Sequence, residues 1–145
     1  SSRRTSGSRS VRISRDLIDA IVAHSRDDLP NECCGLIGGT TGADGEMTSV
    51  HRARNAAATW LRYEVHPSDQ FRIMERIEED GEDLVGIYHS HTKSEAYPSQ
   101  TDINLADGWP DPLYLICSLE QADDPVVRAF AIRDGAVEEV ELDVT

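Results

Sequence analysis

The chain has 145 residues, with 27 Asp and Glu against 14 Lys and Arg, so its formal net charge at pH 7 is −13. This length is enough for one domain with one core, and so acidic a chain lacks the basic patch that nucleic acid or an anionic membrane requires. Three cysteines and no apolar stretch of about 20 residues predict neither a disulfide framework nor a membrane span, and favour a cytoplasmic protein.

The N-terminal segment, residues 1–10, is rich in Ser and Arg, and no apolar stretch of a secretion signal follows it. We interpret it as a flexible tail ahead of one domain that spans residues 11–145. Residues 11–13 predict a short edge strand. Ser14 is typical of a helix N-cap, and an apolar stripe at helical spacing predicts a helix that ends before the first proline and leaves His24 on its solvated face.

A short strand is predicted over residues 33–37, directly after Glu32. Its adjacent thiols, Cys33 and Cys34, are interpreted as small apolar residues of this strand, because nothing beside them supplies the base or the positive charge that a reactive cysteine requires. The two glycines that follow, at positions 38 and 39, indicate a turn, and residues 47–54 predict a strand that pairs back.

The segment of residues 55–67 has no clear period and contains two large aromatic side chains, Trp60 and Tyr63. Aromatic residues in loops are often part of a binding surface, so this segment is the candidate for gripping a substrate, with Tyr63 in the cleft. Packing of both rings into the core is the alternative. A second helix is predicted after this segment, capped by Ser68 or Asp69 and packed through Phe71, Met74 and Ile77.

Two histidines, His89 and His91, end an apolar run that predicts a buried strand. Positions i and i+2 of a strand point to the same face, so both imidazoles can converge on one metal ion. Pro98 closes the next loop, and Ser99 is typical of a helix N-cap. The side chain of Asp102, in the first turn of that helix, can then point toward the two histidines as a third ligand. Three ligands leave a position for water, which is typical of catalytic zinc. Taken alone, the histidine pair fits two half-exposed polar residues without an ion better than it fits a pair of ligands, and the spacing of Ser99 and Asp102 reverses that preference.

Three further strands are predicted after this short helix. Residues 113–117 are apolar throughout and therefore form a central strand, and residues 126–132 and 137–142 flank a hairpin turn at Asp134-Gly135. Helices and strands are interspersed along the chain, which favours an α/β or α+β fold with six or seven strands.

The pattern His-Ser-His, seven residues, Ser, two residues and Asp, from His89 to Asp102, resembles the motif of the JAMM (MPN+) zinc metalloprotease family. That motif also has an upstream glutamate, and Glu32, just ahead of a Cys-Gly-Leu strand, resembles it. All five motif positions are therefore filled. The resemblance implies an α/β, single-domain JAMM/MPN fold of the cytidine-deaminase-like type, with a central mixed β-sheet flanked by helices.

The resemblance also implies a role for each motif residue. The ligands of Zn²⁺ would be His89, His91 and Asp102. Glu32 would carry a proton from the attacking water to the leaving amine, and the Ser99 hydroxyl would stabilise the oxyanion while also capping its helix.

Two residues outside the motif are also expected at the site. Ser90 is expected to orient the ligands through contacts next to them, without binding the metal itself. Tyr97 is expected to fix its loop or to line the cleft together with Tyr63.

Members of this family cut amide or isopeptide bonds after the Gly-Gly tail of ubiquitin-like proteins, and the wider sequence resembles actinobacterial members that act on sulfur carriers. The resemblance implies hydrolysis of the amide bond after the C-terminal Gly of such a carrier, with release of cysteine from a CysO-cysteine-type adduct in cysteine biosynthesis. Two alternatives stay open: a processing peptidase that removes C-terminal extensions from carriers of another pathway, and a non-catalytic MPN-type interaction domain. The oligomeric state is not predicted.

Overall fold

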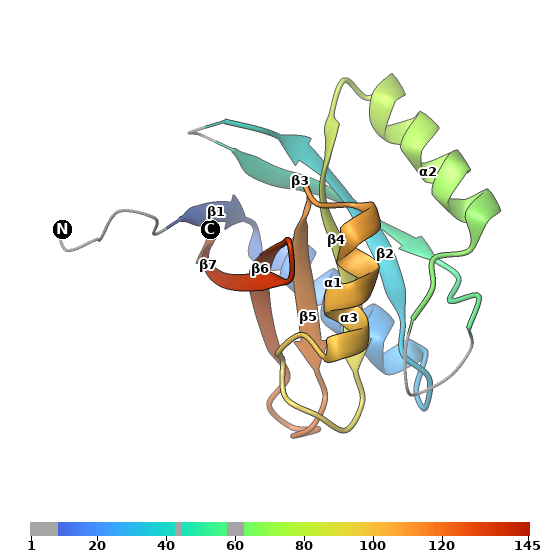
Figure 1. The fold of residues 1–145 in the computed structure, drawn as a ribbon, viewed down its shortest axis with the longest axis vertical. Coiled ribbons are helices and arrows are strands. Elements are labelled where there is room, and N and C mark those ends of the chain that lie inside the picture. The colour runs from blue at the N-terminus through green and yellow to red at the C-terminus, as the bar shows by residue number, and fades with distance from the viewer. Residues whose placement is uncertain (1–8, 43–44, 58–62) are drawn as a thin grey trace, which may run out of the picture.

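The fold is seen in a computed structural model that describes residues 9–42, 45–57 and 63–145. Apart from residues 9 and 10, the predicted tail lies outside these ranges, as does Trp60. The elements, in chain order, are β1 (Ser10–Ile13), α1 (Arg15–Asp27), β2 (Cys34–Thr40), β3 (Glu46–Ala53), α2 (Pro67–Glu79), β4 (Asp83–His91), α3 (Gln100–Leu105), the 3₁₀ helix η1 (Ala106–Gly108), β5 (Leu113–Ser118), β6 (Val126–Arg133) and β7 (Ala136–Val144) (Figure 1).

The strands form one mixed sheet in the order β1-β3-β2-β4-β5-β6-β7. β4 and β5 are parallel, and the pairs β2–β3, β2–β4, β5–β6 and β6–β7 are antiparallel. β1 pairs in parallel with β3 on one side and with β7 on the other, so the sheet closes on itself. The prediction of an edge strand at residues 11–13 is therefore wrong, because pairing with the far end of the chain leaves no local sequence signal.

Alternation along the strands divides the core into two clusters, one on each face of the sheet. The first cluster contains Ile21 of α1, and the second contains Ile77 of α2. Neighbouring residues of β2 separate in the same way, with Ile37 in the α1 cluster and Leu36 in the α2 cluster. The expected fold, a mixed sheet flanked by helices, is thus confirmed. None of the helices in the described ranges has the length and hydropathy needed to cross a bilayer.

The first helix is capped as predicted, since the Ser14 hydroxyl accepts the Leu17 N–H. His24, however, is not on a solvated face. The residue is only 4% exposed, and its Nδ1 lies 2.6 Å from the Tyr88 hydroxyl. Tyr88 reaches from β4 to α1, and the imidazole gives its buried hydroxyl the hydrogen-bond partner that an apolar residue could not provide.

The second helix begins earlier than predicted and is capped by His66. Phe71, expected in the core, is 68% exposed, whereas Ile77 is buried as expected. Phe71 faces away from the core because Asp69, in the first turn of the helix, is anchored to the end of β3. Asp69 Oδ2 accepts both the backbone N–H and the Nε–H of Arg54, at 2.8 and 2.9 Å.

Two glycines predicted as a turn, Gly38 and Gly39, instead continue β2, and the pairing register shifts at this point. A Cβ at position 39 would meet the backbone of Glu46, so glycine allows β3 to approach closely here. The predicted hairpin between β6 and β7 is confirmed. Asp134 and Gly135 have φ angles of 54° and 79°, as a two-residue turn of this type requires.

Gly35 supports β4 from the neighbouring strand, where it pairs with Tyr88. A Cβ at position 35 would overlap ring atoms of that buried tyrosine, whose hydroxyl is held by His24. We expect Gly35→Ala to lower the free energy of unfolding by about 1–3 kcal/mol, as overpacking typically does. Urea denaturation measures the change. The control is Gly108→Ala, where a Cβ meets open space; equal stability of the two variants contradicts this prediction.

Candidate metal centre

The three predicted ligands converge in a buried cluster at the end of β4. Asp102 Oδ2 lies 3.1 Å from His89 Nε2 and 3.0 Å from His91 Nε2, and the two nitrogens are 3.2 Å apart. Each residue is at most 4% exposed. The ligands of a tetrahedral zinc ion with bonds of about 2.0 Å are about 3.3 Å apart. The cluster therefore has the dimensions of one face of a metal site.

Asp102 is oriented by the first turn of α3, which crosses in front of β4 in Figure 1. Ser99 and Asp102 form a reciprocal capping box. The Ser99 hydroxyl oxygen accepts the Asp102 N–H at 3.1 Å, and Asp102 Oδ2 accepts the Ser99 N–H at 2.9 Å. The carboxylate oxygen that faces the histidines is thus fixed by the backbone of the helix, while the Ser99 hydroxyl proton is not used by the cap.

The two histidines are held by different contacts. His91 Nδ1 lies 2.8 Å from the Glu95 carbonyl oxygen. Because a carbonyl only accepts, Nδ1 carries a proton, so in the neutral imidazole Nε2 directs its lone pair into the cluster. His89 instead stacks on Tyr63, with ring centroids 4.2 Å apart and an interplanar angle of 17°. Tyr63 is 5% exposed and packs in the core cluster on the α2 side, as the packing alternative predicted, and its place in a substrate cleft stays a prediction.

The pKa values of the cluster follow from burial and mutual charge. Burial by itself would raise the pKa of Asp102, but the two histidines and the Ser99 N–H hold it well below its usual range. Burial lowers the pKa of His89, against the effect of Asp102. Burial also acts to lower the pKa of His91, but hydrogen bonds to Asp102 and Glu95 outweigh it, so that pKa is raised. An ionised carboxylate among imidazole nitrogens is a suitable donor set for a cation.

Glu32 lies beside the cluster, just ahead of β2. Cys34 pairs with His89 across the antiparallel ladder, so residue 32 is level with His91. The Glu32 side chain is 5% exposed, and its Oε1 has no hydrogen-bond partner among the described residues. Burial raises the pKa of Glu32 to about 8, with His91 opposing this and Asp102 adding to it. This unused oxygen and the donor set together fit a metal ion with a water beside it.

Ser90 lies between the two ligand histidines but on the other face of β4. Its hydroxyl accepts the Cys33 N–H at 2.8 Å, and its own N–H donates to the Cys33 carbonyl at 3.2 Å. It therefore joins the histidine strand to the segment that carries Glu32, and its predicted role in orienting the ligands stays a prediction.

Tyr97 lies on the loop that follows β4 and packs edge-on against Phe130, with ring centroids 5.3 Å apart. It is not among the residues that line the groove beside the cluster. Of the two predicted roles, fixing the loop is the one that its contacts support.

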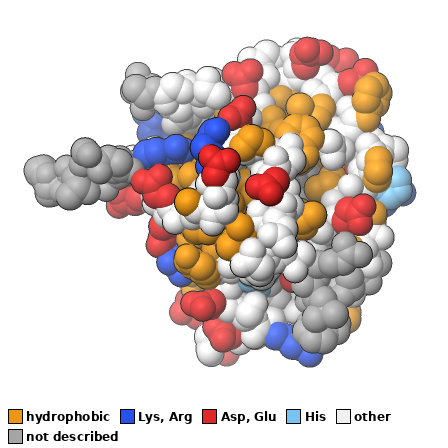
Figure 2. Space-filling model, viewed as in Figure 1, with side chains coloured by type: hydrophobic (Ala, Val, Ile, Leu, Met, Phe, Trp, Pro, Cys, Tyr) orange, Lys and Arg blue, Asp and Glu red, His pale blue; other side chains and the backbone are white. Residues whose placement is uncertain are grey.

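A groove of about 330 Å³ opens beside the cluster, between α2 and the α3–η1 segment. Its lining includes Leu36, Tyr63, Val65, Leu84, Ile87 and Trp109. Of the predicted site residues in the described ranges, Tyr63 alone lines this groove, and this residue, which is 5% exposed, also stacks on His89. Hydrophobic side chains gather over this part of the surface, with acidic side chains around them (Figure 2).

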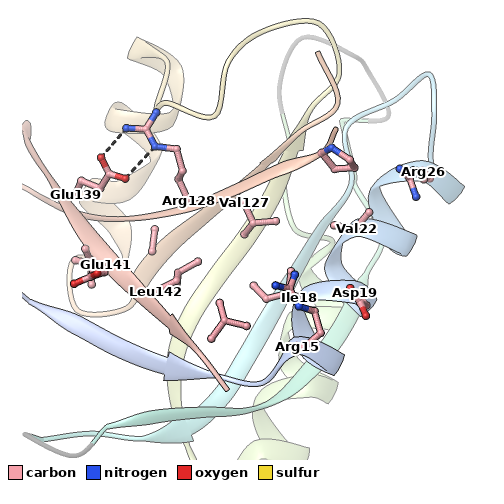
Figure 3. Close-up of a pocket in the computed structure, with 14 residues that line it drawn as sticks. Arg15, Ile18, Asp19, Val22, Arg26, Val127, Arg128, Glu139, Glu141 and Leu142 are labelled. Atoms are coloured by element: carbon pink, nitrogen blue, oxygen red, sulfur yellow. Dashed lines mark hydrogen bonds and ion pairs between the residues drawn. The ribbon is translucent and has the colours of Figure 1, made fainter. Parts of the chain in front are cut away.

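A larger groove, of about 540 Å³, lies between α1 and strands β6 and β7 (Figure 3). Arg128 and Glu139 face each other at this groove in an ion pair of 2.6 Å. None of the predicted site residues lines it. This groove is therefore separate from the metal cluster.

One residue that contacts the site, Asn55, was not predicted. Its Nδ2 donates to the Glu32 carbonyl oxygen at 2.9 Å. A single asparagine after a strand is most simply interpreted as a turn residue, and it belongs to no motif, so the sequence contains no signal for this contact.

Comparisons with known proteins agree with this geometry. The family model of Prok-JAB, the prokaryotic homologs of the JAB domain, matches residues 14–133. The chain is 38% identical to the CysO-cysteine peptidase of Mycobacterium tuberculosis over 132 residues, which cover 91% of this chain and 89% of that protein. It is 40% identical to a desampylase of Haloferax volcanii over 111 residues, 73% of this chain and 78% of that protein.

Among solved structures, protein DSY2949 from Desulfitobacterium hafniense is similar with a TM-score of 0.85 and 31% sequence identity, over 93% of this chain and 92% of that chain. The resemblance to the JAMM (MPN+) family, predicted from the motif, is thereby confirmed. The chain belongs to the Prok-JAB family, the prokaryotic homologs of the JAB domain.

Proposed function

We propose that the protein is a zinc-dependent peptidase that hydrolyses the amide bond after the C-terminal Gly of a ubiquitin-like sulfur-carrier protein and releases cysteine from a CysO-cysteine-type adduct. The observation that carries this proposal is the buried convergence of His89, His91 and Asp102, with the unused oxygen of Glu32 beside it. Similarity to a CysO-cysteine peptidase over 91% of the chain supports the choice of substrate.

Each residue of the site has a distinct part in this proposal. His89, His91 and Asp102 hold the metal. A zinc ion bound there supplies Lewis-acid chemistry, which lowers the pKa of a water toward 7 and polarises the scissile carbonyl. Glu32 accepts the proton of the attacking water and delivers it to the leaving amine. The Ser99 hydroxyl, whose oxygen accepts in the helix cap, donates a hydrogen bond to the developing oxyanion.

The groove beside the cluster supports a carrier tail as the bound segment. Tyr63, in the wall of this groove, stacks on His89, so a chain bound in the groove lies one residue away from a ligand. A Gly-Gly tail has no side chains to clash with such a wall. Bulkier residues need more width than such a tail.

The proposal predicts the products of a direct assay. A sulfur-carrier protein with a C-terminal cysteine adduct is incubated with the zinc-loaded protein, and its intact mass is measured over time. We expect loss of one cysteine residue from the carrier and appearance of free cysteine. The Glu32→Gln variant is the enzyme control. An unchanged carrier mass, with zinc bound and the fold intact, contradicts the proposed substrate.

The second candidate function is cleavage of carrier–protein conjugates or of C-terminal extensions. It is favoured by the 40% identity to a desampylase, which exceeds the identity to the cysteine-releasing peptidase although it covers less of the chain. The same assay separates the two if it includes a peptide-extended carrier and a carrier linked to a lysine side chain. Cleavage of these alone favours the second candidate. A non-catalytic interaction domain is not favoured, because all five motif residues are present and the three ligands converge.

A further inference from the structure

Asn55 follows β3, and its carboxamide connects three segments of the chain. Its Nδ2 donates to the Glu32 carbonyl oxygen, and its Oδ1 accepts the backbone N–H groups of Ala57 and Glu64, each at 2.9 Å. Only an amide side chain of this length offers both the donor and the acceptor, since aspartate has no donor and leucine has neither.

On the loop side, Asn55 fixes the chain next to the aromatic wall of the groove. Glu64, which donates to its Oδ1, directly follows Tyr63, the residue that stacks on His89. Backbone bonds close the same loop. The Ala56 N–H donates to the Glu64 carbonyl at 2.6 Å, and Asn55 forms an antiparallel β-bridge with Val65. The acceptor half of the carboxamide therefore holds the backbone beside the tyrosine that stacks on His89.

On the other side, Asn55 holds the segment that carries Glu32. The Glu32 carboxyl oxygen Oε1 has no partner in the described part of the chain, so its position depends on the backbone that carries it. Cys33, the next residue, is bound on both its N–H and its carbonyl by Ser90 of β4. Asn55 holds the Glu32 carbonyl itself, so the two side chains fix this backbone from β3 and from β4.

We infer that Asn55 is a positioning residue of the hydrolytic site, which sets Glu32 and Tyr63 together relative to His89 through one carboxamide. The kinetic consequence rests on the proposed function, whereas the link between the segments does not. A displacement of about 1 Å in a reacting group can lower a rate on the order of 100-fold, so the contact bears on kcat although Asn55 does not touch the reacting atoms.

Two substitutions separate the two halves of the carboxamide. Asn55→Asp keeps the acceptor for Ala57 and Glu64 but removes the donor to Glu32. We expect it to lower kcat by about tenfold or more while KM stays within about threefold. Asn55→Ala removes both halves, so kcat falls and KM rises as well. Zinc content remains at the wild-type level in both variants, since no ligand is changed.

The matched control is Asn104→Asp, the same chemical change at an exposed asparagine whose Oδ1 accepts from Gln100. It should leave kcat, KM and the melting temperature unchanged. A merely structural role for Asn55 predicts parallel losses of activity and melting temperature in both of its variants, without the split between kcat and KM.

Amide hydrogen exchange distinguishes failure of this inference from failure of the proposed function. We expect the amides of Ala57 and Glu64 to exchange at least about tenfold faster in Asn55→Ala but at the wild-type rate in Asn55→Asp. If the wild-type protein cleaves no carrier adduct while this exchange pattern holds, the proposed function fails and the link stands. Either a kcat within twofold of wild type in Asn55→Asp or unchanged exchange in Asn55→Ala overturns the inference.

Discussion

Replacement of Glu32 by glutamine is expected to abolish hydrolysis of the carrier adduct while the metal stays bound. Glutamine has nearly the same shape, but its amide cannot accept the proton of the attacking water. General acid–base catalysis contributes about 100- to 10,000-fold to a rate, so kcat should fall by that order. The decrease is measured by intact mass of the carrier over time, and bound zinc is quantified by elemental analysis of the same preparation.

The matched control for this variant is Glu120→Gln, the same change at an exposed glutamate. It should leave both kcat and zinc content unchanged. Full activity in Glu32→Gln would refute the assignment of Glu32 as the proton carrier. Loss of zinc together with activity would instead assign Glu32 as a metal ligand.

The convergence of the ligands could be predicted because it depends on short-range geometry. His89 and His91 share a face through the two-residue period of a strand, and Ser99 brings Asp102 back through a helix cap only three residues long. Their metal-binding role stays a prediction until zinc is measured. Glu32 was assigned by resemblance alone, because the 56 positions between it and His89 carry no geometric information.

Features that depend on distant partners could not be predicted from local pattern. His24 has the spacing of a surface residue, yet it is buried because Tyr88 reaches it from a strand 64 residues away. Phe71 fits an apolar stripe, but the anchor between Asp69 and Arg54 leaves Phe71 exposed while Ile77 of the same stripe is buried. In each case the sequence indicated the element correctly, and a contact between segments decided which way its side chains face.

The same limit explains why Asn55 was missed. Glu32, Ala57 and Glu64 bond to its carboxamide through backbone groups, so no pattern of side chains marks these contacts. A motif reports the residues that perform chemistry. The residues that hold those groups in position are identified only when the hydrogen bonds of the folded chain are known.

Asp102 is the residue whose replacement should most directly remove the metal. Its Oδ2 is the one negatively charged ligand atom in the described cluster, and it lies 3.1 and 3.0 Å from the two histidine nitrogens. Asparagine would place a neutral oxygen there that still accepts the Ser99 N–H, so the cap of α3 is kept. The change therefore alters the charge of the site with little effect on its shape.

Loss of a residue that only hydrogen-bonds to a metal ligand reduces metal affinity by roughly 10- to 100-fold. We expect Asp102→Asn, which changes a ligand itself, to reduce zinc affinity by more than this and to abolish hydrolysis. The purified Asp102→Asn variant should retain less than about half an equivalent of zinc. Added zinc should raise the melting temperature of the wild type but not of the variant, because only a bound ligand stabilises the folded state. Asp107→Asn, at an exposed aspartate in η1, is the control. A full equivalent of zinc in Asp102→Asn contradicts the assigned ligand set.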